Sequence, residues 1–359
     1  MTFCRLNQQK IRADSYRGMI DYLQRSADKS DNRIGKMVIL PSSFTGSPRN
    51  MYYQDAMAIV RKFGKPDLFV TMTCNPNWRE IQENLLPGQI ASDRPDIVSR
   101  VFDIKKDELI TIIKKKKLFG EVLAFVYVVE YQKRGLPHIH LLVTLKHGDK
   151  MLTPEKVDKY IYAEIPDSNI YPILHNIVIK NMIHACGDWC KNEKGGCSKR
   201  FPKLFQNETT MDENGYPTYC RRNTGDFLLP NGSTTDNQYV VPYNPILLKT
   251  FNCHINVEIV TSIKSVKYLY KYIYKGHDKA AAQITNNNNN DNNNNNTIDH
   301  DEIKNHIDSR YVSPVEACDR IYGRPLQNKN HSIIRLPVYL PNEQSITISD
   351  EASEEAMMH

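Results

Sequence analysis

The sequence contains no long run of apolar residues. No stretch approaches the ~18 residues that a helix needs to cross a membrane. The first residues, MTFCRLNQQKIRAD, lack the apolar segment of a secretion signal. These absences predict a nuclear or cytoplasmic protein without a membrane partner. Cysteines stay reduced in those compartments, so clustered members of the eight cysteines are expected to bind metal rather than form disulfides.

Neither sign of charge dominates the composition. The chain has 47 basic and 41 acidic residues, and the net charge of +6 by itself indicates little about nucleic acid. Two basic blocks are more informative, and a block of this kind is either a solvated face or a contact with phosphate. The first contains Lys105, Lys106 and Lys114 to Lys117, and the second contains Lys199, Arg200, Lys203, Arg221 and Arg222.

Helix and strand patterns are mixed without a regular alternation. Strands are expected at 67–73, 121–131 and 138–145, and the short loop QKRGLP between the last two favours antiparallel pairing. Helices are expected at 51–63, from about 93 until Gly120, within 151–184, and at 257–276. This mixture predicts an α+β fold with a central antiparallel sheet that carries the H-x-H strand and is flanked by helices.

Composition divides the chain into segments. Residues 1–50 are expected to form a leading helical segment and loop, followed by a main domain over 51–280 with a loop-rich, cysteine-containing insert at about 184–235. A tract of ten asparagines around Asp291 predicts a disordered insertion over 281–300. Residues 301–345 are expected to return to the domain, and 346–359 form an acidic tail.

The stretch GLPHIHLLV places two imidazoles on an apolar strand. His138 and His140 share one side of the strand because side chains alternate, and they stand roughly 7 Å apart there. Glu130 lies near the end of the preceding strand and reaches the same site if the two strands pair. Two imidazoles and a carboxylate predict a catalytic metal site with open positions, suited to Mn²⁺ or Mg²⁺ and not excluding Zn²⁺. The alternative is a pair of ordinary, hydrogen-bonded strand histidines.

The stretch KYLYKYIYKG places tyrosines on a predicted helix. Tyr268 and Tyr272 are four residues apart and share a face, and Lys271 and Lys275 follow each by three positions. Tyr270 and Tyr274 point elsewhere and suit packing against a sheet. A tyrosine beside a cation is a candidate nucleophile toward phosphorus. An aromatic packing stripe is the alternative for all four.

The stretch HACGDWCKNEKGGC gathers thiols in a loop-rich segment. Cys186, Cys190 and Cys197 are candidates for a tetrahedral structural Zn²⁺ site, with His184 or Cys220 as the fourth ligand. The spacing differs from that of a standard zinc finger. The alternative is a set of reduced cysteines that serve as small apolar residues.

Separated blocks of the chain resemble a known family. The blocks are FGKPDLFVTMTCNPNW, EYQKRGLPHIHLLV, AEIPD, CSKRFPK, VVPYNPILL, HINVE and VKYLYKYIYKGHD. They are similar to the nuclease region of Helitron transposases, often called the Helitron helicase-like domain, within the HUH endonucleases. The resemblance runs from about residue 8 to about 345, with the asparagine tract as an interruption.

The resemblance implies a rolling-circle transposition chemistry. His138, His140 and Glu130 would hold a divalent ion, and Tyr268 or Tyr272 would attack single-stranded DNA to give a 5′-phosphotyrosyl link. Two tyrosines would allow strand transfer. Lys271 and Lys275 would steady the phosphate or the phenolate. Lys114, Lys115, Lys116 and Lys117 would follow the DNA backbone.

Histidine-triad hydrolases also carry alternating histidines on a strand. Histidine-triad hydrolases need a third histidine where Leu142 stands, which argues against them. No GxxxxGK[ST] motif is present, so the helicase of full transposases is expected to be separately encoded or lost and the chain to be a fragment. The alternative function is a DNA-binding remnant of a transposable element that cuts nothing productively.

Overall fold

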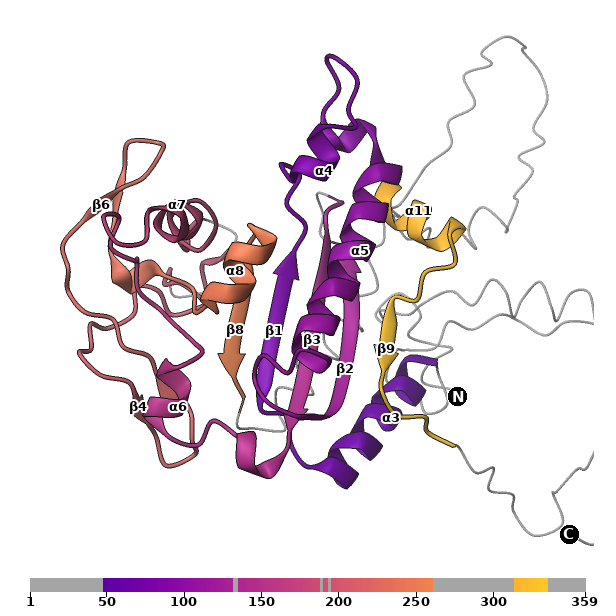
Figure 1. The fold of residues 1–359 in the computed structure, drawn as a ribbon, viewed down its shortest axis with the longest axis horizontal. Coiled ribbons are helices and arrows are strands. Elements are labelled where there is room, and N and C mark those ends of the chain that lie inside the picture. The colour runs from indigo at the N-terminus through magenta and orange to yellow at the C-terminus, as the bar shows by residue number, and fades with distance from the viewer. Residues whose placement is uncertain (1–47, 132–134, 188–189, 193–194, 261–312, 335–359) are drawn as a thin grey trace, which may run out of the picture.

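A computed structural model describes residues 48–131, 135–187, 190–192, 195–260 and 313–334 (Figure 1). Residues 1–47 of the predicted leading segment, the tyrosine helix from residue 261 onward, the asparagine tract and the acidic tail lie outside the described residues, whereas residues 48–50 already belong to a helix. Within the described ranges, no helix is long and apolar enough to cross a membrane.

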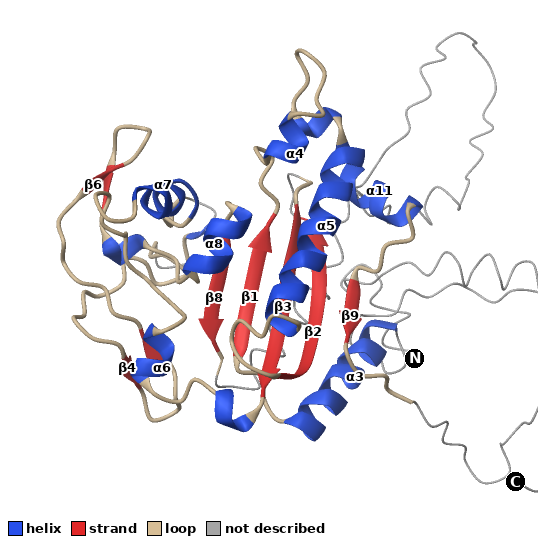
Figure 2. Cartoon of the chain, viewed as in Figure 1, coloured by secondary structure: helices blue, strands red, loops and turns tan. Residues whose placement is uncertain are grey.

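The fold is built on an antiparallel sheet of five strands. The strands are β1 (Leu68–Thr73), β2 (Val122–Tyr131), β3 (Pro137–Leu145), β8 (Ile255–Ile259) and β9 (Gln327–Lys329). Their order is β8-β1-β3-β2-β9, and every neighbouring pair is antiparallel (Figure 2). The predicted α+β fold with a central antiparallel sheet is confirmed. The H-x-H strand β3 is the middle strand, and all nine of its residues are buried.

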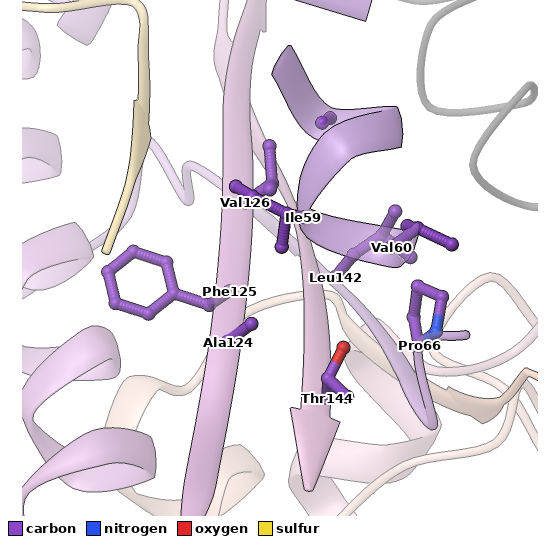
Figure 3. Close-up of a pocket in the computed structure, with 9 residues that line it drawn as sticks. Ile59, Val60, Pro66, Ala124, Phe125, Val126, Leu142 and Thr144 are labelled. Carbon is purple, nitrogen blue, oxygen red and sulfur yellow. The ribbon is translucent and has the colours of Figure 1, made fainter. Parts of the chain in front are cut away.

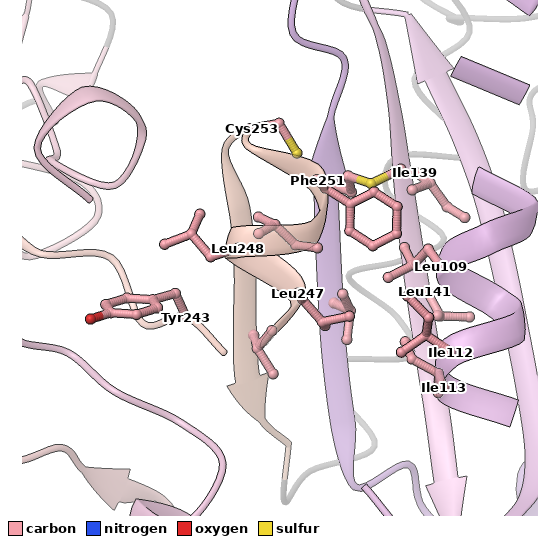
Figure 4. Close-up of a cluster of buried hydrophobic side chains, with 14 of the residues drawn as sticks. Leu109, Ile112, Ile113, Ile139, Leu141, Tyr243, Leu247, Leu248, Phe251 and Cys253 are labelled. Atoms are coloured by element: carbon pink, nitrogen blue, oxygen red, sulfur yellow. The ribbon is translucent and has the colours of Figure 1, made fainter. Parts of the chain in front are cut away.

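Helix α5 (Pro95–Lys114) covers one face of the sheet. Its Leu109, Ile112 and Ile113 pack against Ile139 and Leu141 of β3 (Figure 4). Each buried aliphatic side chain of this kind contributes about 1.5–3 kcal/mol relative to exposure. The helix begins with Pro95 at its first turn, as its sequence predicts, but ends at Lys114 instead of continuing until Gly120.

Helix α3 (Pro48–Phe63) covers part of the opposite face. Its Ala56 belongs to a smaller core cluster with Phe69, Val128 and Leu142 of the sheet. Figure 3 shows Ile59, Val60 and Leu142 around a small space between this helix and β2 and β3. That space is lined almost entirely by apolar side chains, so it is a packing gap rather than a binding site for a polar ligand.

The chain between β3 and β8 forms a loop-rich region at the β8 side of the sheet (Figure 1). Its helices are η2 (His147–Asp149), α6 (Pro154–Asp158), α7 (Pro172–Asn181), η4 (Asn237–Tyr239) and α8 (Pro245–Phe251), and its strands are β4 (Thr210–Met211), β5 (Pro217–Thr218), β6 (Phe227–Leu228) and β7 (Thr234–Thr235). Two further short helices, α4 (Arg79–Gln82) and η1 (Ala91–Asp93), lie between β1 and α5. Arg221 stabilises the loop-rich region because its buried guanidinium donates to the carbonyls of Ala163, Asn237 and Val240.

The predicted helix at 257–276 is wrong at its start, because residues up to Ile259 belong to strand β8. Ile255, Val257 and Ile259 alternate toward the core, and β8 pairs with β1 along its length. β-branched residues with a period of two fit a pleated strand better than a helix. Residues 257–259 of the predicted helix therefore belong to the edge strand β8, which pairs with β1.

The C-terminal described segment returns to the sheet. Helix α11 (Pro314–Ile321) packs on α5, and β9 extends the sheet beyond β2. Asp319 of α11 is buried and joins three elements: it accepts hydrogen bonds from Ser99 of α5 at 2.6 Å and from Tyr131 of β2, and it pairs with Arg324 at 2.9 Å.

Candidate metal centres

The sheet register aligns polar side chains on one face. Thr73 of β1 lies opposite His138 of β3, and His138 lies opposite Glu130 of β2. Two pairs further along, Thr71 lies opposite His140. Directly opposed residues point to the same side of a sheet, so these side chains share the face that α3 covers at its other end.

Threonines of β1 orient both imidazoles. A hydrogen bond of 2.7 Å joins Thr73 Oγ1 and His138 Nδ1, and one of 3.1 Å joins Thr71 Oγ1 and His140 Nδ1. When Nδ1 carries the proton and donates to the hydroxyl, Nε2 keeps a lone pair for a metal ion. Sequence analysis missed these threonines, because their role depends on the pairing of strands about 65 residues apart.

The Nε2 atoms differ in their surroundings. His140 Nε2 lies 3.2 Å from Glu130 Oε2, so the predicted convergence of Glu130 with the histidine pair is present for His140. His138 Nε2 is buried and has no hydrogen-bond partner within the described part of the chain. A buried nitrogen without a partner costs free energy unless a ligand satisfies it.

Burial keeps His138 neutral. Desolvation, together with the charges of His140 and His254, lowers the pKa of His138 from 6.5 to about 3. The neutral imidazole is the form that binds metal. A neutral nitrogen without a partner beside a second imidazole and a carboxylate fits a divalent ion with mixed N/O ligands.

The donors of this set are not drawn together into a closed cluster. The rings of His138 and His140 are nearly parallel, 13° apart in plane, with centroids separated by 6.5 Å. Among the described residues, the one group of three or more ligands whose donor atoms all lie within 4.8 Å of one another is found elsewhere. The three side chains share one face but would have to move closer to bind a common ion.

His254 extends the row by one strand. It immediately precedes β8, and its carbonyl accepts a hydrogen bond of 2.9 Å from the backbone N–H of Thr73. Its Nδ1 is hydrogen-bonded to the carbonyl of Asn181 at 2.9 Å. Sequence analysis did not select His254, although alternation back from Glu258 places it on the histidine face once the β1–β8 register is known.

The cysteine-containing segment forms the compact cluster. His184, Cys186, Cys190 and Cys197 place their ligand atoms within 4.8 Å of one another, and Cys197 Sγ lies 3.3 Å from His184 Nε2. Three sulfur atoms and one imidazole match the ligand set of tetrahedral structural metal sites. The predicted cluster is present, and the residues around 186–197 can hold a metal ion.

Of the two candidates for the fourth ligand, His184 is the one in the cluster. Cys220 is directed elsewhere: its Sγ lies 3.2 Å from the carbonyl oxygen of Asn207 and 3.7 Å from Glu164 Oε1. Cys220 is therefore not the fourth member of the cluster. The chain between Cys197 and Cys220 leads away from it through the short strands of the loop-rich region.

Backbone N–H groups favour the thiolate at Cys197. Burial opposes ionisation there, but hydrogen bonds from the backbone N–H groups of Phe201 and Lys199 outweigh it and lower the pKa of Cys197. Burial, followed by hydrogen bonds with Cys197 and Cys190, raises the pKa of Cys186 to about 11. A thiol whose ionisation is favoured by the backbone is suited to metal binding, because the thiolate is the form that ligates the ion.

The lysines at the end of α5 lie away from the histidine face. Lys114 to Lys117 lie at the end of α5, on the other face of the sheet and near the end where Val122 pairs with Leu145. The structure does not bring them near His138, which pairs with Glu130 at the opposite end of the same strands. The role of Lys114, Lys115, Lys116 and Lys117 in DNA binding stays a prediction. Tyr268, Tyr272, Lys271 and Lys275 lie outside the described residues.

The N-terminal part of the chain is similar to a known domain family. Residues 1–143 match the family model of the Helitron helicase-like domain at the N-terminus. The matched region contains β1 and β2 and ends within β3, after His138 and His140. The comparison with curated proteins found no match. Residues 1–143 are thus similar to the Helitron helicase-like domain.

Proposed function

We propose that the chain is an HUH-type, metal-dependent nickase and strand transferase for single-stranded DNA that acts in Helitron rolling-circle transposition. The observation that carries this proposal is the row of Thr73, His138 and Glu130 across three adjacent strands, with His140 beside it. The family match over residues 1–143 supports the same function.

The histidine face provides the binding part of the mechanism. His138, His140 and Glu130 would hold Mn²⁺ or Mg²⁺, and such an ion would polarise the scissile phosphate. Thr71 and Thr73 orient the rings through Nδ1, which leaves Nε2 as the metal-binding nitrogen, and an ion would draw the side chains closer together as it binds. Glu130 adds the negative charge and the oxygen donor that Mn²⁺ and Mg²⁺ prefer.

Tyrosines supply the nucleophile in this proposal. The phenol oxygen of Tyr268 or Tyr272 forms a bond to phosphorus, the bond from phosphorus to the 3′ oxygen breaks, and the phenol proton is taken up by the departing 3′-hydroxyl. Lys271 and Lys275 steady the phosphate. The second tyrosine accepts a second strand. No oxidant or energy source is consumed, because one phosphodiester is exchanged for another.

A structural Zn²⁺ is proposed for the cluster of His184, Cys186, Cys190 and Cys197. Sulfur ligands select Zn²⁺ over Mg²⁺ or Mn²⁺, so the two sites would hold different ions. The helicase activity needed for transposition would come from another region or another chain.

The test is the formation of a covalent adduct with labelled single-stranded DNA in Mn²⁺. Attack that leaves a 3′-hydroxyl attaches the protein to the downstream fragment, so a 3′-labelled oligonucleotide gives labelled protein. A 5′-labelled one gives only a shortened, free fragment. The double variant Tyr268→Phe, Tyr272→Phe is expected to form no adduct, and so is His138→Ala, His140→Ala.

The matched control is Tyr270→Phe, Tyr274→Phe, which removes the same two hydroxyl groups from the same stretch of sequence. It is expected to keep the adduct. An adduct that persists in the Tyr268→Phe, Tyr272→Phe variant would reject the nucleophile assignment. DNA binding without any adduct in the parent protein would instead identify a non-cutting DNA-binding protein.

A further inference from the structure

The segment that follows the cysteine cluster carries two exposed cations. Lys199 and Arg200 are both exposed, and neither forms an ion pair with any residue that the structure describes. The other arginines of the same basic block are engaged, because Arg221 is buried among backbone carbonyls and Arg222 pairs with Glu164. Lys203 is half-buried, and its ammonium donates to the carbonyl of Lys199 at 3.0 Å, so Lys199 and Arg200 are the exposed members of this block that can bind an anion.

The metal cluster holds this segment in place. Cys197 begins the segment, and its sulfur accepts hydrogen bonds from the backbone N–H groups of Lys199 and Phe201. The backbone N–H of Arg200 donates to the carbonyl of Cys197 at 2.9 Å. The ring of Phe201 stacks on that of His184, with centroids 4.2 Å apart and planes at 19°. An ion bound by Cys197 and His184 would hold the start of the segment and the ring on which Phe201 stacks.

The segment lies beside the histidine face. His254 connects the two regions: it is hydrogen-bonded to Asn181, three residues before His184, and its backbone is bonded to Thr73, the partner of His138. The segment is also held next to His184 by the backbone: the N–H of Lys203 donates to the carbonyl of Gln238 at 3.0 Å, and the N–H of His184 donates to that of Tyr239 at 2.8 Å.

We propose that residues 197–203, when ordered by metal at the cysteine cluster, bind the phosphates of single-stranded DNA through Lys199 and Arg200 and guide the strand toward His138 and His140. The identity of the ligand as DNA rests on the proposed function. His254 connects the region of this segment to Thr73 beside His138, whereas the lysines at the end of α5 lie at the opposite end of the same strands.

The experiment measures the affinity of the zinc-loaded protein for a labelled single-stranded oligonucleotide at several NaCl concentrations, without Mn²⁺ or Mg²⁺. Each phosphate contact on a single strand contributes about 0.7 to the slope of log affinity against log salt. The variant Lys199→Gln, Arg200→Gln is therefore expected to lower the slope by about 1.4. The matched variant Lys115→Gln, Lys116→Gln removes the same charge from α5 and is expected to leave the slope unchanged.

A slope that is unchanged in Lys199→Gln, Arg200→Gln, or that falls equally in both variants, overturns the proposal. The metal requirement has its own variant, Cys190→Ser. It is expected to weaken binding as much as Lys199→Gln, Arg200→Gln, and the combination of all three changes is expected to add no further loss. Undiminished binding in Cys190→Ser, or in parent protein stripped of zinc while its circular dichroism is retained, overturns the role of the metal.

These outcomes are separate from those of the adduct test. If the parent forms the tyrosyl adduct and the salt slope does not respond to Lys199 and Arg200, the nuclease stands and this surface is rejected. If the slope responds and no adduct forms, the surface stands and the nuclease is rejected.

Discussion

Replacing Thr73 by valine tests whether strand β1 prepares His138 for a metal ion. The change keeps the shape of the side chain but removes the hydroxyl that lies 2.7 Å from His138 Nδ1. Partners of this kind orient a metal-binding ring, and their loss costs about 10–100-fold in metal affinity. That range equals about 1.4–2.7 kcal/mol of binding free energy. The buried Nδ1 would also lose its partner, at a cost of about 1–3 kcal/mol in the free energy of unfolding.

The assay is calorimetric titration of the protein with Mn²⁺, accompanied by thermal unfolding of the metal-free protein. Thr144→Val is the matched control: Thr144 of β3 is a buried threonine on the same face of the sheet but lies at the α3 end, away from the histidines. We expect Thr73→Val to bind Mn²⁺ at least tenfold more weakly than Thr144→Val. Equal affinity of the two variants for Mn²⁺ would refute the reasoning that the β1 threonine positions His138.

The remaining predictions concern charge at the same face and the attachment of α11. Glu130→Gln keeps the size of the side chain but removes its charge, so calorimetry should show weaker Mn²⁺ binding; unchanged affinity would exclude Glu130 as a ligand. The metal-free protein should lose stability as pH falls from about 6.5 toward 3, because burial lowers the pKa of His138 and the unfolded chain then binds the extra proton. The slope should approach 1.4 kcal/mol per pH unit, and it should flatten in His138→Gln when unfolding is followed by denaturant titration. Asp319→Asn should destabilise the protein by about 1.5–3 kcal/mol, because it removes the buried carboxylate charge that accepts from Ser99 and Tyr131, while Arg324 keeps its pair with Asp103; the exposed Asp226→Asn should be nearly neutral, and similar denaturation midpoints for the two would contradict the role of Asp319.

Local patterns were sufficient to predict most of the elements around the sheet. The helix with Val98, Phe102, Leu109 and Ile113 on one face and the strands that flank the QKRGLP loop could be read from their apolar periods. The antiparallel pairing of β2 with β3 followed from the short loop. The segment at 257 could not be assigned correctly in this way, because a short apolar run is compatible with both periods and its pairing with β1 spans most of the chain.

The candidate sites were predictable to the extent that they depend on residues close in sequence. His138 and His140 share a face because of strand alternation alone, and the three thiols of the cluster lie within one short segment. The contribution of Glu130 required the assumption that two adjacent strands pair. Thr71, Thr73 and His254 could not be found, because threonine and histidine have no distinctive pattern and only the register of distant strands brings them to the site.

The packing of the opposite face determines that register. Leu68, Val70 and Met72 of β1 are fully buried on the α5 side and alternate with Phe69, Thr71 and Thr73. A slip of one residue between β1 and β3 would turn the three apolar side chains out of the core and replace Thr73 by an apolar neighbour at His138. Exposing three such side chains would cost roughly 5–9 kcal/mol, whereas the Thr73–His138 hydrogen bond contributes only about 0.5–1.5 kcal/mol to stability. The hydrophobic core therefore sets the register, and the threonine–histidine bonds are its consequence. For this reason, Thr73→Val should weaken metal binding while the sheet keeps its pairing, and the loss of affinity can be attributed to the orientation of the ring.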